Sequence, residues 1–113
     1  MRQGEIYIVA LDSAIGHEQA KTRPCIVLQN NALTQKLGTI LVAPITSTII
    51  REAYPNIVFL SAKSCGLSRD GIIKIEQLRA VDKSRVQSFI GQAPLAVVDA
   101  CKLAIKDVFA IDN

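Results

Sequence analysis

The spacing of apolar residues changes part-way along this 113-residue chain, and that change constrains the fold more than any other feature. In the first two thirds, short runs rich in valine, isoleucine and leucine are separated by glycine, proline and polar residues, which is typical of β-strands. We expect strands over residues 5–11, 24–29, 39–45, 56–60 and 72–75, and residues 78–81 either continue the last of these or add a sixth strand. In the last third the spacing becomes helical. Short strands followed by helices predict an α+β domain with a small, strongly bent antiparallel sheet or partial barrel.

The last third predicts a short helix and then a longer one. Asp82 is a favourable N-cap for the short helix, in which Val86, Phe89 and Ile90 would share one face and Gly91 would end the helix.

The longer helix is expected to begin at Pro94, because proline is favoured in the first turn of a helix. Its apolar stripe would be Val98, Cys101, Ile105 and Val108, and its polar side Asp99, Lys102 and Lys106. We expect both helices to pack outside the sheet.

Length and composition indicate one globular domain over residues 1–113. Half of the residues are hydrophobic and one fifth are charged, which argues against disorder. The longest apolar run, residues 39–45, is too short to span a membrane, and the first residues lack the apolar segment of a signal peptide. We therefore expect a cytoplasmic protein. The net charge of +3 permits an anionic partner but is below that of typical duplex-binding domains.

Residues that commonly bind metals are sparse. Cys25, Cys65 and Cys101 are widely spaced and odd in number, and His17 is the single histidine. The sequence therefore predicts buried, reduced cysteines, no metal site and no cofactor.

Arg23 stands directly before Pro24 and an apolar strand, after a polar segment over residues 12–22 that is too long for a tight hairpin. The proline biases Arg23 toward an extended backbone, so its guanidinium would project from a restrained position. A guanidinium is permanently charged and binds phosphate oxygens through two donors. Arg23 is therefore a candidate anion-binding residue, and the alternative is an arginine that only solvates the strand end.

Two further polar clusters follow predicted strands. Thr46, Ser47 and Thr48 come at the end of the third strand, where hydroxyls can donate to a phosphate or close a turn on their own backbone. Residues 75–79, with the sequence IEQLR, lie between two apolar stretches. They would read base edges at the mouth of the sheet, hold the neighbouring loop, or face solvent from a strand.

An ordered set of short motifs resembles the MazF/PemK family, the toxin endoribonucleases (mRNA interferases) of type II toxin–antitoxin pairs. The match runs from residue 4 to about residue 85; each motif is weak alone, but their order is specific, and the C-terminal helix matches only in kind. The motifs are Gly4-Glu5-Ile6-Tyr7, Gly16-His17-Glu18-Gln19, Arg23-Pro24, Val27-Leu28-Gln29-Asn30, Ile45-Thr46-Ser47, Ser61-Ala62-Lys63, Gly66-Leu67-Ser68-Arg69-Asp70 and Glu76-Gln77-Leu78-Arg79-Ala80-Val81-Asp82.

The resemblance implies an SH3-like, CcdB-type β-barrel with appended helices that acts as a homodimer. It implies cleavage of single-stranded RNA at short sequences without a metal, and neutralisation by a cognate antitoxin. The family's essential arginine and threonine fall on Arg23 and Thr46. The residues expected to contact RNA are Glu18, Gln19, Lys21, Ser47, Glu76, Gln77 and Arg79. His17 replaces the serine common in the family, so no role is transferred to it.

Metal-free RNA cleavage uses the 2′-hydroxyl of the substrate and leaves a 2′,3′-cyclic phosphate and a 5′-hydroxyl. Arg23 suits stabilisation of the phosphoryl oxygens, with Thr46 donating a neutral hydrogen bond to the same group. The proton acceptor stays open between His17, Glu18 and a mechanism without a separate base. Tyr54 is expected near RNA or the dimer partner, or else covers the core.

Two rival functions remain to be separated by experiment. A DNA-gyrase poison of the same barrel type would act through C-terminal residues that include a tryptophan, whereas this chain has no tryptophan and ends Ile111-Asp112-Asn113. A non-catalytic SH3-like peptide-binding module would have no need to retain both Arg23 and Thr46.

Overall fold

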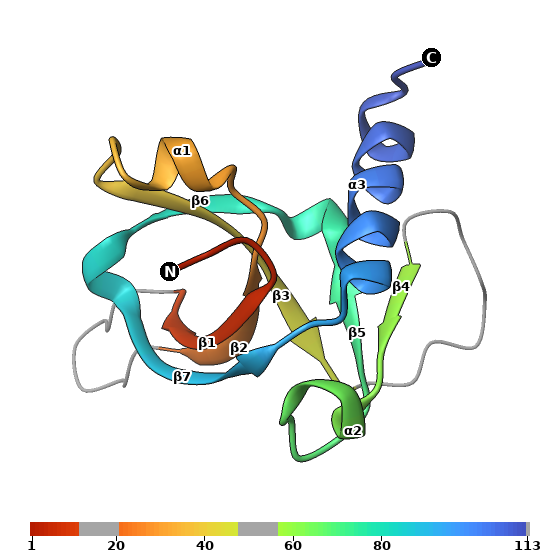
Figure 1. Ribbon diagram of the computed structural model, residues 1–113, viewed down its shortest axis with the longest axis horizontal. Coiled ribbons are helices and arrows are strands. Elements are labelled where there is room, and N and C mark those ends of the chain that lie inside the picture. Colours follow the sequence, from red (N-terminus) through yellow and green to blue (C-terminus); the bar gives the residue numbers. More distant parts are fainter. Residues whose placement is uncertain (12–20, 48–56, 113) are drawn as a thin grey trace.

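The computed structural model describes residues 1–11, 21–47 and 57–112, and within these ranges it contains a seven-stranded sheet, three α-helices and two 3-10 turns (Figure 1). The strands are β1 (Glu5–Ala10), β2 (Thr22–Val27), β3 (Thr39–Thr46), β4 (Ile57–Leu60), β5 (Gly71–Lys74), β6 (Arg79–Asp82) and β7 (Val86–Gln92). The helices and turns are α1 (Asn31–Thr34), α2 (Ala62–Cys65), η1 (Ile75–Gln77), η2 (Lys83–Arg85) and α3 (Leu95–Phe109). No helix within these ranges is both long and apolar enough to cross a membrane.

The sheet is organised around β3, its longest strand. The strand order is β4-β5-β3-β2-β1-β7, with β6 also pairing with β3, and every pairing is antiparallel. β6 pairs with the first half of β3 and β5 with its last two residues, so different partners hold the two halves. β4 and β7 are the ends of a bent sheet that does not close (Figure 1). The predicted α+β class and the expected strands are confirmed, with bounds within two residues, and β6 is a strand separate from β5.

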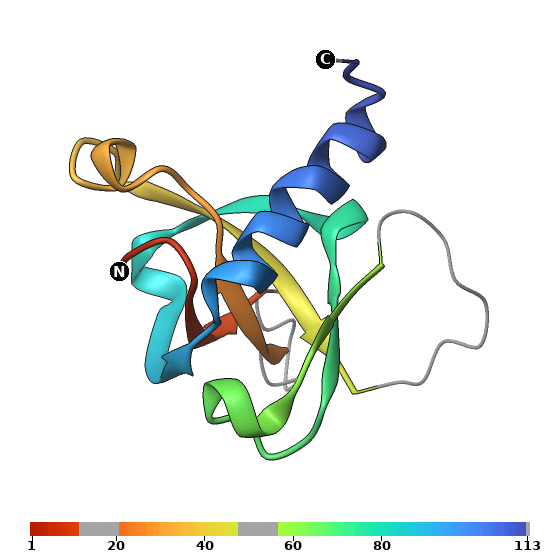
Figure 2. The ribbon, with the colours of Figure 1, turned by 45° about the vertical axis from the view of Figure 1, so that its right-hand side comes forward.

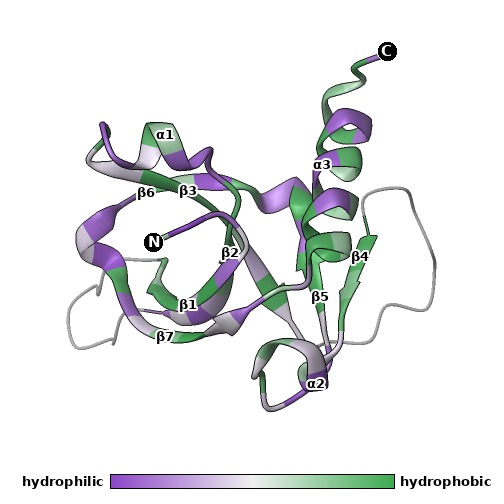
Figure 3. Cartoon of the chain, viewed as in Figure 1, coloured by the Kyte–Doolittle hydropathy of each residue, from purple (hydrophilic) through white to green (hydrophobic). Residues whose placement is uncertain are grey.

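Both faces of the central strands are buried, because the bent sheet encloses one set of side chains and α3 covers another. In β2, Ile26 belongs to one buried cluster, whereas Cys25 and Val27 belong to the other. Strands β4 and β5 are largely apolar in Figure 3. The main core contains Ile6, Ile26, Leu28, Ala43, Ile45, Val58, Leu60, Cys65, Ile73, Ile75, Ala93, Val98, Cys101 and Ala104. The second core contains Val9, Leu11, Cys25, Val27, Ile40, Val42 and Val81.

The three cysteines are divided between these cores. Cys25 lies in the second core, and Cys65 and Cys101 lie in the main core; all three are buried and free. The prediction of buried, reduced cysteines is therefore confirmed.

The long C-terminal helix is confirmed as α3, with Pro94 as its N-cap residue. It packs outside the sheet against β4 and η1 (Figure 2). Its buried face is formed by Val98, Cys101 and Ala104, whereas Val108 is 42% exposed. The expected apolar stripe is therefore correct in its first half and wrong at Val108, because the end of α3 extends past the sheet (Figure 2).

The short helix expected after Asp82 is wrong. Asp82 does act as a cap, since its Oδ1 accepts a hydrogen bond from Ser84 N at 2.8 Å, but it caps only the single 3-10 turn η2. The next residues, Val86–Gln92, form β7, which pairs with β1. β-branched and aromatic residues suit a strand as well as this helical spacing does, and pairing with β1 satisfies the backbone of β7.

Gly91 also has a different role from the helix end that the sequence suggested. A Cβ at this position would lie 1.9 Å from Cys65 O, so no side chain fits between β7 and the backbone of α2. The glycine therefore permits close packing of α2 on β7.

Candidate active site

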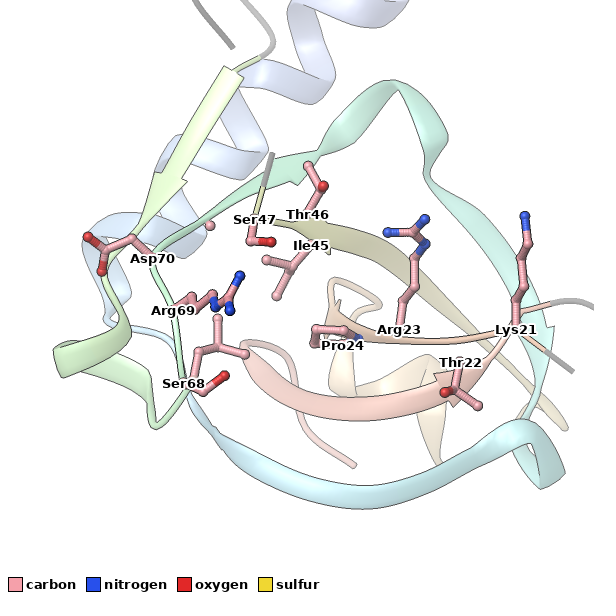
Figure 4. Close-up of a pocket in the computed structure, with 12 residues that line it drawn as sticks. Lys21, Thr22, Arg23, Pro24, Ile45, Thr46, Ser47, Ser68, Arg69 and Asp70 are labelled. Carbon is pink, nitrogen blue, oxygen red and sulfur yellow. The ribbon is translucent and has the colours of Figure 1, made fainter. Parts of the chain in front are cut away.

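The start of β2 and the end of β3 border a cavity of about 440 Å³ (Figure 4). This volume lies in the range of about 300–1,000 Å³ that is typical of ligand sites. The loop between α2 and β5 supplies the remaining wall. The described residues that line the cavity are Lys21, Thr22, Arg23, Pro24, Ile45, Thr46, Ser47, Leu67, Ser68, Arg69, Asp70 and Gly71.

Strand pairing brings Arg23 and Thr46 to the same cavity. Cys25 pairs with Pro44 in the antiparallel register of β2 and β3. Arg23 lies two residues before Cys25 in β2, and Thr46 lies two residues after Pro44 in β3, so the same register places them opposite each other. Side chains two residues apart on a strand share a face. Both residues line the cavity (Figure 4). Arg23 is exposed and Thr46 is half-buried, so both are accessible from solvent.

Three cationic side chains line the cavity without a carboxylate partner in the described parts of the chain. They are Lys21, Arg23 and Arg69, and all three are exposed. Among the described lining residues, Asp70 is the one carboxylate, and its Oδ1 accepts a hydrogen bond from Ala62 N at 2.8 Å. The cavity therefore carries an excess of positive charge, which favours an anionic ligand.

Arg79 approaches the same face of the sheet from β6. It pairs with Val42 of β3, and its charge acts on the Cys25 thiol together with that of Arg23. Burial nevertheless raises the pKa of Cys25 to about 12, because it outweighs the lowering by Arg79 and by Arg23. The thiol is therefore protonated at neutral pH and is unsuited to act as a nucleophile.

Glu76 and Gln77, which were expected to contact RNA, lie in η1 and do not line this cavity. Glu76 forms an ion pair with Lys74 (Nζ–Oε1 3.1 Å) and borders a second hollow of about 210 Å³. That hollow lies between η1 and the end of α3, and its described lining is Ile75, Glu76, Leu78, Ile105, Val108 and Phe109.

Five residues singled out from the sequence lie outside the described residues: His17, Glu18, Gln19, Thr48 and Tyr54. Of the remaining predicted site residues, Lys21, Arg23, Thr46 and Ser47 line the cavity.

The α2–β5 wall of the cavity was not assigned a role from the sequence. Ser68, Arg69 and Asp70 form most of this wall. They lie within a motif that resembles the family pattern, which is the signal that could have pointed to them.

A family model covers almost the whole chain. It matches residues 2–109 and is described as PemK-like, MazF-like toxin of type II toxin-antitoxin system. The chain belongs to this family. The resemblance seen in the sequence motifs is thereby confirmed, and it extends through α3.

Two relatives of this PemK-like toxin exceed 30% identity. Endoribonuclease EndoA from Bacillus subtilis (strain 168) is 32% identical over 111 residues, which cover 98% of this chain and 96% of the relative. Endoribonuclease MazF from Staphylococcus epidermidis is 31% identical over 102 residues, which cover 88% of this chain and 85% of the relative.

Solved structures share the fold of this PemK-like toxin. The Mycobacterium tuberculosis toxin MazF-mt6 superposes with a TM-score of 0.80 at 24% identity, covering 96% of this chain and 99% of that chain. A mycobacterial endoribonuclease in complex with its cognate antitoxin superposes with a TM-score of 0.82 at 17% identity, covering 100% of this chain and 98% of that chain.

Proposed function

We propose that this PemK-like toxin is an endoribonuclease that cleaves single-stranded RNA at short sequences. One observation carries the proposal: Arg23 and Thr46 line one cavity at the ends of adjacent strands, and no described carboxylate forms an ion pair with Arg23. The names of the relatives from B. subtilis and S. epidermidis, both endoribonucleases, support the same activity.

The proposed reaction is an attack of the substrate's 2′-oxygen on the adjacent phosphorus. The 2′-O–P bond forms and the P–O5′ bond breaks, while one proton leaves the 2′-oxygen and one reaches the 5′-oxygen. The products are a 2′,3′-cyclic phosphate and a 5′-hydroxyl. Negative charge grows on the non-bridging phosphoryl oxygens, where a preorganised cation stabilises the transition state more than the ground state.

Arg23 would bind these oxygens through two N–H donors, and Thr46 would add a neutral hydrogen bond. Arg23 is a poor proton acceptor, because a guanidinium scarcely deprotonates. His17 and Glu18 remain the candidate acceptors.

We propose that the cleavage needs no metal ion. The single carboxylate among the described lining residues, Asp70, already accepts a hydrogen bond from Ala62 N. Guanidinium, ammonium and hydroxyl groups predominate in the lining, and guanidinium and ammonium groups are not metal ligands.

We further propose that the whole chain is one cytoplasmic toxin domain of the SH3-like, CcdB-type barrel class, that it acts as a homodimer, and that a cognate antitoxin neutralises it. The outer surface of α3 supports protein partners, because Leu95, Leu103 and Phe109 are 73%, 62% and 64% exposed. The mycobacterial endoribonuclease of this fold that was solved in complex with its cognate antitoxin supports an antitoxin partner.

The test is incubation of the purified chain with a long, single-strand-rich RNA in EDTA. We expect discrete fragments whose 5′ ends accept phosphate directly from polynucleotide kinase and whose 3′ ends carry cyclic phosphate. Arg23→Ala should abolish the fragments. Arg2→Gln, an exposed arginine outside the cavity, should leave them unchanged.

The same assay separates the rival functions. Intact RNA would overturn the nuclease proposal, and inhibited gyrase in a parallel supercoiling assay would then favour the gyrase poison. Cleavage that appears only after Mg²⁺ is added would overturn metal independence alone.

A further inference from the structure

Arg69 reaches the cavity from a different wall than Arg23. It lies in the loop between α2 and β5, whereas Arg23 belongs to β2. In Figure 4 the Arg69 side chain extends toward Ser47, and Arg23 stands on the other side of the end of β3. The two guanidiniums therefore flank the strand end that carries Thr46.

The loop that carries Arg69 is anchored on both sides. Before Arg69, Gly66 ends α2 in the left-handed conformation (φ 86°), and Leu67 packs against the main core. After it, the Oδ1 of Asp70 accepts the hydrogen bond from Ala62 N at 2.8 Å, which joins the end of the loop to the start of α2. This anchoring restrains the backbone of Arg69 and reduces the entropy lost when its side chain binds a ligand.

The positive charge of Arg69 is not neutralised by any residue that the structure describes. Arg69 is exposed, and in the described parts of the chain its guanidinium has neither an ion pair nor a hydrogen bond. The carboxylate of its neighbour Asp70 accepts the hydrogen bond from Ala62 N and forms no ion pair with Arg69 among the described residues (Figure 4). An arginine that lines a cationic cavity from a restrained loop, and that has no partner among the residues the structure describes, is suited to bind an external anion.

We propose that Arg69 binds the phosphate next to the scissile one. A single strand carries a phosphate at each nucleotide, so a strand whose scissile phosphate lies at Arg23 and Thr46 places a neighbouring phosphate along the same cavity. Arg69 then fixes the direction and register of the strand, while Arg23 acts on the reacting group. This role rests on the proposed nuclease function and makes Arg69 a binding residue rather than a catalytic one.

The test measures binding separately from cleavage. The probe is a fluorescent RNA of about ten nucleotides that spans a cut site mapped by the cleavage assay, with a 2′-deoxynucleotide at the cut to block reaction. Affinity is measured over a range of salt for the wild type, Arg69→Gln, Arg69→Lys and Arg2→Gln. In a second series of probes, each phosphate in turn is replaced by a neutral methylphosphonate.

We expect Arg69→Gln to weaken binding about tenfold and to reduce the slope of log affinity against log salt by about 0.7, the value for one phosphate contact on a single strand. In the wild type, one methylphosphonate beside the cut should weaken binding, and this loss should disappear in Arg69→Gln but remain in Arg2→Gln. Arg69→Lys should keep the salt slope and recover part of the affinity, because it retains the charge but not the two-donor geometry. Unchanged unfolding in urea is expected for every variant.

Two results would overturn the role of Arg69, and they are distinguishable. If the wild type cleaves and binds but Arg69→Gln loses neither affinity nor salt slope, the role of Arg69 is wrong and the nuclease function stands. If the wild type cleaves no RNA, there is no cut site for the probe to span, and both proposals fall together.

Discussion

The two hollows of this toxin differ in how their charges are used. The cavity at the ends of β2 and β3 contains Lys21, Arg23 and Arg69 without carboxylate partners in the described chain. The hollow between η1 and α3 is lined mainly by apolar side chains, and the one charged residue in its described lining, Glu76, is paired with Lys74.

The two hollows therefore differ more sharply in whether their charged residues are paired than in their volumes. Unpaired cations repel one another, so gathering them in one cavity costs stability unless a ligand neutralises them. The apolar side chains around the second hollow belong to η1 and α3 or lie next to them, where the helix packs against the main core. We therefore expect changes at the first hollow to affect the rate of RNA cleavage, and changes to the apolar lining of the second hollow to affect the free energy of unfolding.

The largest expected effect on stability is at the floor of the second hollow. Ile75 is 1% exposed and belongs to the main core, so Ile75→Ala should lower the free energy of unfolding by about 2–5 kcal/mol. Urea unfolding followed by circular dichroism measures this. Cleavage per folded molecule should be unchanged at low temperature. A variant of normal stability that no longer cleaves RNA would place the second hollow in the active site.

At the first hollow, the cavity at the ends of β2 and β3, the largest expected effect is on the rate of RNA cleavage. Arg23→Ala should reduce RNA cleavage by about 10²–10³-fold, because it removes the cation that stabilises the phosphoryl oxygens. Its unfolding free energy should change by less than about 0.5 kcal/mol, since Arg23 is exposed. Arg23→Lys should recover only part of the rate, because one ammonium cannot replace a two-donor guanidinium. Single-turnover cleavage of a short RNA measures the rates of both variants. Full activity in Arg23→Ala would show that the first hollow is not the active site.

The buried thiols of Cys25 and Cys101 test whether nearby arginines change the ionisation of a core residue. Burial raises the pKa of Cys25 and of Cys101 from 9.0 to about 12, although only Cys25 has arginines nearby. At pH values between 9 and 12, each thiol stays protonated in the folded protein but ionises in the unfolded protein. Stability is therefore complete below pH 9 and falls as pH rises toward 12, by about 1.4 kcal/mol per pH unit for each thiol.

Urea unfolding at pH 8 and pH 10 measures this dependence, with Cys25→Ala and Cys101→Ala as matched variants. Each substitution should remove a similar part of the loss at pH 10, because burial dominates at both sites. A native Cys25 that reacts rapidly with a thiol reagent at pH 8 would show instead that the arginines dominate.

Local sequence was enough to predict the strands and the long helix. It failed at β7, because the spacing of Val86, Phe89 and Ile90 fits a helix and a strand alike, and pairing with β1 decides between them. The four-residue helices α1 and α2 were not foreseen, since one turn is too short to show a hydrophobic period.

In the candidate site, too, some residues could be found from local sequence and others only from the pairing of distant strands. Arg23 and Thr46 carry local signals, a following proline and a preceding apolar strand, and the antiparallel register then brings them to one cavity. Arg69 carries no such signal. Its place depends on the pairing of β5 with β3 and on the bond between Asp70 and Ala62, which local sequence does not reveal.

The smallest expected effect is at Glu76, which tests whether the second hollow takes any part in RNA recognition. Glu76→Gln removes a partly exposed ion pair with Lys74, so the free energy of unfolding should change by less than about 1 kcal/mol. The resemblance implies that Glu76 contacts RNA, where a carboxylate would accept hydrogen bonds from base amino groups exposed in a single strand. We therefore expect a changed distribution of cut sequences with little change in rate at the preferred site, measured by sequencing the cut ends of a long RNA. A distribution identical to that of the wild type would confine recognition to the first hollow and make the separation between the two hollows complete.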